Sequence, residues 1–517
     1  MVLSFLLVGV LALLPALSRA FTNPVIWNDL ADVEIRNING VFYYSASTMH
    51  YSPGAPILRS YDLFNWEFIG HSVPSLDFGS NYDMANGTRA YVEGVWASFF
   101  NFNPHTNLWM WGGCIDFWHS YIYTAPAVTG PWTQHTQIYK CYYDAGMLID
   151  DDGSMYVSFV QNNNIWVAQL TADATAEASS QEVFPQSDTY GYLEGTRMYK
   201  RNGYYYILAD HPSTSEIVFK ASSPFGPYTS KVLVDTVSPP LTAGPPHQGG
   251  IVDAGNDTWY YMAFVDSYPG GRIPILAPLT WGSDGFPSVD LVNGGWGSSY
   301  ANPLAAHPVP SLTGTDTFSG TSLGPQWEWN HNPDTTKFSV NNGLTLKTAT
   351  VTPDLYSARN TLTHRILGPS STATIKLALG GMADGDRAGL ALFRDHTGWV
   401  GVARDGGALA VRMVTDVDLS QTGWTTTNTG ADGASPVALP KGAATIWLRV
   451  KADIAPASDQ TAQFSYSTDG SKFTNIGGPF TMENSWNFFM GYRFGIFNYA
   501  TVALGGSVKV SEFTLSA

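Results

Sequence analysis

Apolar and aromatic residues recur along the first 260 residues in short runs separated by tight polar turns. Five times one such run is followed by a turn and then by a second run dense in Tyr, Trp and Phe. The second runs read VFYYSAS, LWMWGG, SMYVSF, YYYILAD and TWYYMAF. The units are spaced by roughly 45 to 65 residues, near the range of four-stranded propeller blades. Five matched units favour an all-β, five-bladed β-propeller over residues 21–298 rather than a β-sandwich. Residues 172–180 are interpreted as a short helix or a polar loop.

The second half of the chain has a different pattern. Residues 299–314 are rich in Pro, Ala and Ser, which is typical of a linker. The runs that follow, such as RAGLALFRD, ATIWLRVKA and AQFSYST, are separated by Gly- and Asp-containing turns. They predict a two-sheet β-sandwich of the jelly-roll kind over residues 315–517. We expect residues 316–318 to pair with the final strand, VKVSEFTLSA.

The composition of the chain limits the cellular locations and the kinds of partner that are expected. Residues 1–20 form an apolar run ending in Ser-Arg-Ala, which predicts a cleaved signal peptide and an extracellular, secreted protein. A net charge of −16 with only 13% charged residues argues against nucleic acid and anionic membranes as partners. Aromatic residues reach 14%, which fits an all-β core, rings that stack on sugars, or both. We expect a monomer.

Two cysteines and two sequons fit a secreted chain. Cys114 and Cys141 are predicted to form one disulfide, the alternative being two buried free thiols. Asn86 and Asn256 lie in Asn-x-Thr sequons and are predicted glycosylation sites.

Three acids occupy the same register in three of the repeated units. Asp32, Asp144 and Glu194 precede the glycine of the next turn by eight or nine residues. Units repeated around an axis bring equivalent positions together, so these carboxyl groups are expected to converge in a site suited to acid/base chemistry. Other acids compete for these positions: Asp29, Glu34 and Glu93.

The sequence around these acids resembles glycoside hydrolase family 43, whose members are five-bladed propellers that hydrolyse arabinosides and xylosides. Asp32 opens DVEI, similar to the family's Asp-Pro-x-Ile but without the proline. Asp144 precedes an Asp-Asp-Asp-Gly turn at the family's spacing, and Glu194 opens EGT where the family has Glu-Gly-Pro. Further similarities are HQGGIV from His247, GRIP around Arg272, and GPQWEWNHNP over residues 324–333, which extends the resemblance to the C-terminal sandwich.

The resemblance implies hydrolysis with inversion at the anomeric carbon. It makes Asp32 the general base, Glu194 the general acid, and Asp144 the group that orients Glu194 and raises the pKa of its carboxyl. No cofactor is expected for catalysis and no metal is assigned, although relatives suggest a structural calcium near the propeller axis.

Three further residues are candidates for substrate binding. His247 precedes its turn glycine at the same spacing as Asp32, so it either faces the axis or is a hydrogen-bonded core histidine. Arg272 either binds sugar hydroxyls or forms a buried salt bridge with one of the acids. Trp96 either stacks on a xylan chain or fills the core of its blade.

Departures from the family pattern bear on the substrate. Residues 47–52 read STMHYS where the xylosidase branch has a Phe-Glu-Trp-like run, and the family prolines are replaced at Val33 and Thr196. This chain most resembles fungal α-L-arabinofuranosidases that remove the O3-linked arabinose of doubly substituted xylose in arabinoxylan. The alternatives are a β-xylosidase that uses the same three acids and a non-catalytic protein that binds xylan-derived sugars.

Overall fold

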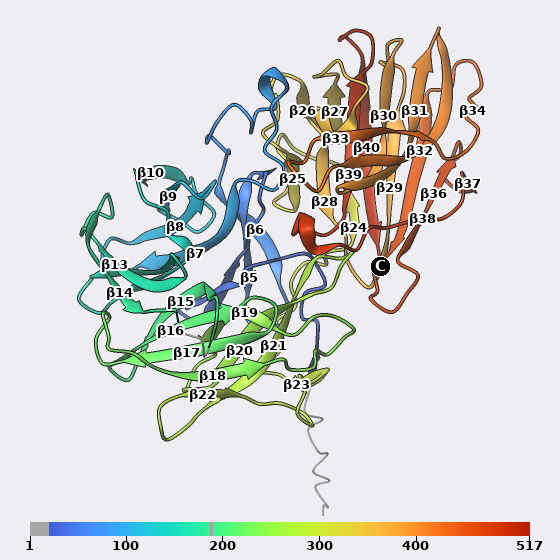
Figure 1. The fold of residues 1–517 in the computed structure, drawn as a ribbon. Coiled ribbons are helices and arrows are strands. Elements are labelled where there is room, and N and C mark those ends of the chain that lie inside the picture. Colours follow the sequence, from blue (N-terminus) through green and yellow to red (C-terminus); the bar gives the residue numbers. More distant parts are fainter. Residues whose placement is uncertain (1–19, 187–189) are drawn as a thin grey trace, which may run out of the picture.

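The computed structural model describes residues 20–186 and 190–517, which form a five-bladed β-propeller followed by a β-sandwich (Figure 1). The predicted all-β architecture is confirmed, and the described part of the chain contains no α-helix. It likewise contains no helix long and apolar enough to span a membrane. The predicted signal peptide, apart from Ala20, lies outside the described residues.

Each blade is a four-stranded antiparallel sheet whose first strand is closest to the axis. Blade 1 is β2, β3, β5 and β6 (Glu34–Ile38, Val41–Ser45, Gly54–Ser60, Glu67–Val73), and blade 2 is β7 to β10 (Val95–Asn103, Leu108–Ile115, His119–Ala125, Thr133–Ile138). Blade 3 is β11 to β14 (Tyr143–Ile149, Met155–Gln161, Asn164–Leu170, Glu177–Phe184). Blade 4 is β15 to β18 (Glu194–Arg201, Tyr204–His211, Ser215–Ala221, Thr229–Asp235), and blade 5 is β19 to β22 (His247–Asp253, Trp259–Asp266, Arg272–Trp281, Pro287–Val289).

In blade 3 the strands near the axis are more buried than the outermost strand. This difference explains why the inner strands could be predicted from the sequence and the outermost strand could not. The first two strands of blade 3, β11 and β12, are buried along most of their length because neighbouring blades cover both faces. The outermost strand, β14, is largely exposed and reads EASSQEVF. The expectation of a helix or loop over residues 172–180 is therefore wrong for residues 177–180. An outer strand that is exposed to solvent does not need alternating apolar and polar residues, so its sequence does not show the pattern by which strands are predicted.

Two short strands tie the ends of the propeller together. β1 (Ala20–Thr22) pairs antiparallel with β23 (Ser299–Ala301), so residues 299–301 of the predicted linker form a strand. The Asn23 side chain donates to the Leu276 carbonyl over 2.9 Å and accepts from the Leu276 N–H over 2.9 Å. The entering segment is thereby anchored to blade 5.

The C-terminal domain consists of two sheets that enclose one large apolar core. The first sheet has β24, β26, β27, β29, β35, β36, β37, β38 and β40 (Gly314–Asp316, Phe338–Val340, Leu344–Lys347, Ser370–Ala378, Thr445–Asp453, Thr461–Ser467, Thr474–Asn475, Phe480–Thr481, Ser507–Ser516). The second has β25, β28, β30 to β34 and β39 (Trp327–Asn330, Leu362–Arg365, Asp386–Phe393, His396–Asp405, Ala408–Leu419, Thr426–Asp432, Val437–Ala438, Arg493–Ala500). The expected pairing with the final strand is present as β24 against β40.

The two domains share a sheet. β4 (Tyr51–Ser52), which belongs to the propeller half of the chain, pairs with β25 and so forms the edge of the second sandwich sheet. Beside this junction the buried Glu328 carboxylate contacts the guanidinium of Arg365 at 2.8 Å and that of Arg493, and lies 3.1 Å from His71 Nε2. The sandwich is thus joined to the propeller by backbone hydrogen bonds and stands beside a buried charge cluster.

Candidate active site

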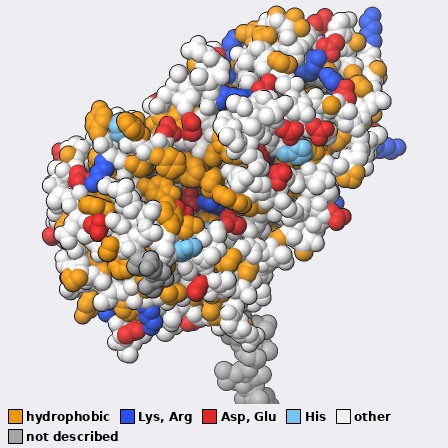
Figure 2. All heavy atoms as spheres, viewed as in Figure 1, with side chains coloured by type: hydrophobic (Ala, Val, Ile, Leu, Met, Phe, Trp, Pro, Cys, Tyr) orange, Lys and Arg blue, Asp and Glu red, His pale blue; other side chains and the backbone are white. Residues whose placement is uncertain are grey.

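The predicted register brings the three acids to equivalent ends of the first strands of three blades. Asp32 lies two residues before β2, Asp144 is the second residue of β11, and Glu194 is the first residue of β15. On the corresponding face of the molecule, acidic and basic side chains are surrounded by a band of hydrophobic side chains (Figure 2). We call Asp32, Asp144, Glu194 and the adjacent Arg272 the acid site.

Asp32 is held on both of its carboxyl oxygens. Ser47 Oγ donates to Oδ2, and Arg272 Nη1 lies 3.1 Å from Oδ1. The Asp32 backbone has φ 62°, and its carbonyl accepts a hydrogen bond of 2.8 Å from Arg197 Nη2. The carboxyl group is therefore fixed in position beside a positive charge.

Asp144 and Glu194 are linked through the backbone that follows Glu194. The Gly195 N–H donates to Asp144 Oδ2 over 3.1 Å, and Tyr143 Oη donates to Glu194 Oε2 over 3.0 Å. Burial raises the pKa of Glu194, and the charge of Asp32 raises it further. Burial also raises the pKa of Asp144 well above its ordinary value, followed by the charges of Glu194 and Asp32. For both carboxyl groups, desolvation contributes more to the raised pKa than a neighbouring carboxylate does, and the carboxylate that acts on Glu194 is Asp32, whereas the sequence analysis expected Asp144.

Gly195 is required at its position for two reasons. Its φ of 66° lies in the left-handed region, and a Cβ there would collide with Asp210 Oδ1 and with the Gln248 side chain. The absence of a side chain at Gly195 therefore allows the close approach of Asp210.

Arg272 and His247 flank the acids from blade 5. Arg272 pairs with Asp32, and its Nε lies 3.4 Å from Asp266 Oδ1, so the salt bridge is present, and the binding of sugar hydroxyls by Arg272 stays a prediction. His247 is buried, its Nδ1 lies 2.9 Å from the Pro245 carbonyl oxygen, and its Nε2 is 3.9 Å from Asp266 Oδ2. Burial lowers the pKa of His247 from its ordinary value.

The competing acids have structural partners. Asp29 accepts hydrogen bonds from the N–H groups of Arg272 and Gly491, each over 2.9 Å. Glu34 is buried between Arg36 and Arg197, at 2.6 and 2.9 Å. The exposed Glu93 accepts a hydrogen bond from Asn81. None of the three replaces Asp32, Asp144 or Glu194 in the acid site.

An aromatic wall stands beside the acids, and part of it comes from the sandwich. Trp96 is half-buried, with ring centroids 5.4 Å from Phe117 and 4.9 Å from Phe489. Phe489 follows the short 3₁₀ turn η3 (Trp486–Phe488) and lies under the Arg272 guanidinium, 5.2 Å from ring centroid to Cζ. Trp96 thus packs at the junction of the domains. Phe489 escaped the sequence analysis because its contacts span nearly four hundred residues and leave no local pattern.

Two further buried acids lie behind Glu194 and were also missed. Asp210 is directly opposite Glu194 in the β15–β16 pairing and opposite Glu216 in the β16–β17 pairing. Among the described residues neither carboxyl oxygen of Asp210 has a hydrogen-bond partner. Burial raises the pKa of Asp210 well above its ordinary value, and burial raises the pKa of Glu216 to about 8. A run read as an apolar strand, YYYILAD, gave no signal beyond its terminal acid.

The predicted disulfide is confirmed. Cys114 and Cys141 are bonded, with their Cα atoms 5.0 Å apart. Asn86 and Asn256 both lie on the surface, and their glycosylation stays a prediction.

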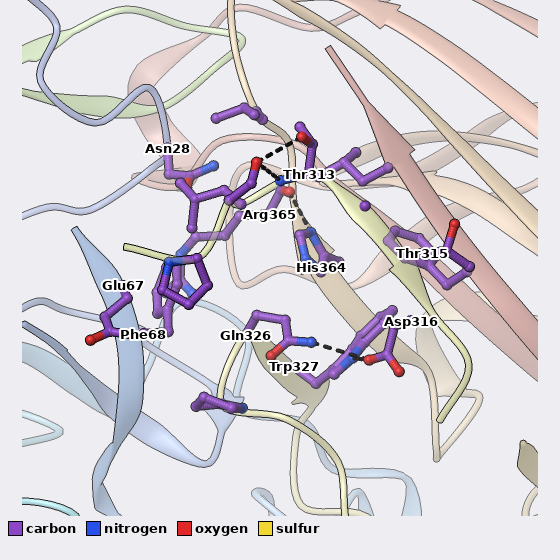
Figure 3. A pocket seen from close by; sticks show the side chains of 18 of the residues that line it. Asn28, Glu67, Phe68, Thr313, Thr315, Asp316, Gln326, Trp327, His364 and Arg365 are labelled. Atoms are coloured by element: carbon purple, nitrogen blue, oxygen red, sulfur yellow. Dashed lines mark hydrogen bonds between the residues drawn. The ribbon is translucent and has the colours of Figure 1, made fainter. Parts of the chain in front are cut away.

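A cavity of about 470 Å³ lies between the domains, apart from the acid site (Figure 3). Phe68 of blade 1, the segment from Pro310 to Thr317, and Trp327 line it. Asp316 accepts hydrogen bonds from Gln326 and from the Trp327 ring, at 3.1 and 2.8 Å. These polar groups bind one another rather than converging on an open position.

Within residues 20–186 and 190–517, no group of three or more His, Cys, Asp or Glu side chains is placed to hold a metal ion. The structural calcium near the axis stays a prediction, and no chemical step is assigned to it.

Comparison with known proteins gives two family matches that follow one another along the chain. Glycosyl hydrolases family 43 matches residues 21–287, and the β-xylosidase C-terminal concanavalin A-like domain matches residues 315–516. A β-xylosidase of Formosa agariphila is 27% identical, with 96% of this chain and 90% of that protein covered. A non-reducing end α-L-arabinofuranosidase of Bacteroides ovatus is also 27% identical, covering 61% of this chain and 62% of that protein.

One solved structure is more similar. It is a family 43 glycoside hydrolase whose active site was engineered to give both endo-xylanase and exo-arabinofuranosidase activity. It is 45% identical to this chain and has a TM-score of 0.93. The match covers 96% of this chain and 100% of the other.

Proposed function

The chain belongs to glycosyl hydrolase family 43, and from that membership we propose that it removes α-L-arabinofuranosyl side chains from arabinoxylan. The specific target is the O3-linked arabinose of a doubly substituted xylose. The chain is a glycosidase whose relatives include β-xylosidases and arabinofuranosidases. The observation that carries the arabinose assignment is the 45% identity, over nearly the whole chain, to the family 43 enzyme whose engineered form displays both endo-xylanase and exo-arabinofuranosidase activity.

The acid site supports a single displacement with inversion. Asp32 takes a proton from water as the water attacks the anomeric carbon, and Glu194 gives its proton to the departing glycosidic oxygen. Inversion needs the two carboxyl groups on opposite faces of the sugar ring, roughly 6.5–9.5 Å apart, so that water fits between the base and the sugar. Asp32 precedes the first strand of blade 1, and Glu194 is the first residue of blade 4. Because they come from different blades, the two carboxyl groups are suited to contact a substrate from opposite sides.

The environment of each carboxyl group matches its proposed role. Ser47 and Arg272 hold Asp32 and supply it with a counter-charge, so it is suited to accept a proton. Burial and the charge of Asp32 raise the pKa of Glu194, which is the direction of shift that a general acid requires. Asp144 bonds the N–H of the residue after Glu194, which fixes the direction of the acid.

A β-xylosidase is the second candidate, and the named relatives support it equally. The Formosa agariphila β-xylosidase covers almost the whole chain, whereas the Bacteroides ovatus arabinofuranosidase covers less of it. Both reactions would use the same acids. They differ in the sugar that enters the site.

The deciding experiment offers both substrates to the purified chain. An arabinoxylan oligosaccharide with arabinose at O2 and O3 of one xylose is incubated in parallel with xylobiose, and early products are followed by proton NMR. We expect arabinose first, released as the inverted β anomer, and no activity in the Glu194→Ala variant. Release of xylose from xylobiose without arabinose would assign the chain to the β-xylosidases. Absence of both products would contradict both proposals and favour sugar binding without hydrolysis.

We further propose that the chain is secreted. The apolar segment at residues 1–20 and the Cys114–Cys141 disulfide support this location.

A further inference from the structure

Three large aromatic side chains are exposed beside the acid site, on two loops of blade 2. Phe117 and Trp118 lie in the turn between β8 and β9 and are 58% and 71% exposed. Tyr139 follows β10 and is 80% exposed. Scattered single apolar residues are normal on a protein surface, but a contiguous group of large ones indicates an interaction site.

The disulfide holds the two loops together. Cys114 is the penultimate residue of β8, and Cys141 is two residues beyond Tyr139. His119 lies between the aromatic rings, with its centroid 5.3 Å from Trp118 and 4.8 Å from Tyr139. We call the rings of Trp118, His119 and Tyr139 the aromatic platform. The disulfide is placed to keep these three rings next to one another.

The aromatic platform is continuous with the acid site. Phe117, adjacent to Trp118, has its ring centroid 5.7 Å from that of Tyr143. Tyr143 in turn donates its hydroxyl to Glu194. Hydrophobic side chains gather over blade 2 on the same face as the acid-site band (Figure 2). A ligand on the platform would thus extend directly from a sugar bound at the acids.

The ionised groups next to the platform are already paired, which points to an uncharged ligand. Asp116 accepts hydrogen bonds from Tyr82 Oη and the Gly94 N–H. Lys140 points to Glu177, with Nζ 2.9 Å from Oε2. A neutral polymer with flat apolar faces matches exposed rings beside charged groups that already have hydrogen-bond or ion-pair partners.

We propose that Trp118, His119 and Tyr139 form a stacking platform for the neutral main chain of a xylan, beside the acid site rather than within it. This inference rests on the proposed function and adds the preferred substrate class: polymeric arabinoxylan rather than short oligosaccharides. The aromatic rings supply contact area at low cost in side-chain entropy, and the disulfide pre-organises them.

The test uses Trp118→Ala, Tyr139→Ala and the double variant in the full-length chain. The matched control is Tyr204→Ala, because Tyr204 is an exposed aromatic residue, 43% exposed, at the turn end of β16 in blade 4. Two quantities are measured: kcat/KM on polymeric arabinoxylan and on an aryl α-L-arabinofuranoside, and retardation in native gels that contain arabinoxylan.

In the double variant, kcat/KM on the polymer should fall about tenfold or more, which corresponds to the loss of one modest contact between the protein and the polymer. The double variant should also no longer be retarded in gels that contain arabinoxylan. Its kcat/KM on the aryl substrate should stay within about twofold of the parent value, as should both values for Tyr204→Ala. A Cys114→Ala/Cys141→Ala variant should also be less retarded, because its two loops are no longer joined. Retained retardation and polymer activity in the double variant would overturn the proposal, and so would an equal loss on both substrates.

Failure of the proposed function gives a different result. If the parent chain releases neither arabinose nor xylose but is retarded by arabinoxylan, and the double variant is not, the platform stands and the catalytic proposal falls. If the platform instead joins two copies of this chain, sedimentation will show a concentration-dependent dimer that the double variant lacks, which overturns the polysaccharide assignment.

Discussion

Replacement of Ser47 by alanine should impair catalysis without unfolding the site. Ser47 Oγ donates to Asp32 Oδ2, which leaves Arg272 as the second group holding that carboxyl. The Ser47 backbone N–H bonds the Ala31 carbonyl over 3.2 Å, and alanine can make the same bond. The substitution therefore removes one hydrogen bond to a charged group and little else.

The size of the effect follows from that bond. A hydrogen bond to a charged group contributes about 1.5–3 kcal/mol. If Asp32 needs that bond to hold the attacking water in line, its loss raises the barrier by the same amount, and kcat falls about 10- to 150-fold. KM should change little, because the proton moves to Asp32 only in the transition state.

Ser45→Ala is the matched control, because Ser45 is buried nearby on β3 and its hydroxyl is without a hydrogen-bond partner among the described residues. Steady-state kinetics on an aryl α-L-arabinofuranoside or β-xyloside, together with thermal unfolding, separates activity from stability. A kcat for Ser47→Ala within about twofold of the parent, or a loss matched by Ser45→Ala, would refute the reasoning.

Three other substitutions probe separate features. Phe489→Ala removes a ring from Arg272 and Trp96 and should lower kcat/KM about tenfold, as steady-state kinetics would show; an unchanged value would mean that the sandwich does not assist the site. Glu328→Gln leaves buried guanidinium groups without their counter-ion and should cost about 3–5 kcal/mol in denaturant unfolding; a loss below about 1 kcal/mol would contradict this. Glu216 has a folded-state pKa of about 8, above its ordinary value of 4.5, so its contribution to stability is complete below pH 4.5 and is lost as the pH rises through 8. Glu216→Gln should flatten that decline in unfolding temperatures measured from pH 5 to 8.5, and an unaltered slope would disprove the assignment.

The acid site could be predicted in outline because its members lie on repeated units. Asp32, Asp144 and Glu194 share a register, and rotation around the axis turns equal spacing along the chain into proximity in space. The five blades were recognisable because the second strand of each blade is largely buried and carries an apolar and aromatic run. β14 was missed because an exposed edge strand carries no such run.

The residues that tune the site could not be found in this way. Ser47 lies on the loop between β3 and β4, Phe489 comes from the other domain, and Asp210 ends a run that otherwise reads as core. Ser47 and Asp210 reach the acids through a loop and a strand pairing, each within one blade, and Phe489 does so through packing between distant segments. Local patterns carry no information about such contacts until the fold is known.

The strand pairing between β4 and β25 limits which exchanges of domains this enzyme can tolerate during evolution or engineering. A propeller separated from its sandwich would expose the backbone edge of β4, uncover the apolar residues Met49 and Tyr51, and lose the ring of Phe489. Recombination that exchanges one half for that of a distant relative must therefore preserve a matching edge. The two halves are accordingly expected to be inherited together, and engineering of new specificities should treat them as one piece.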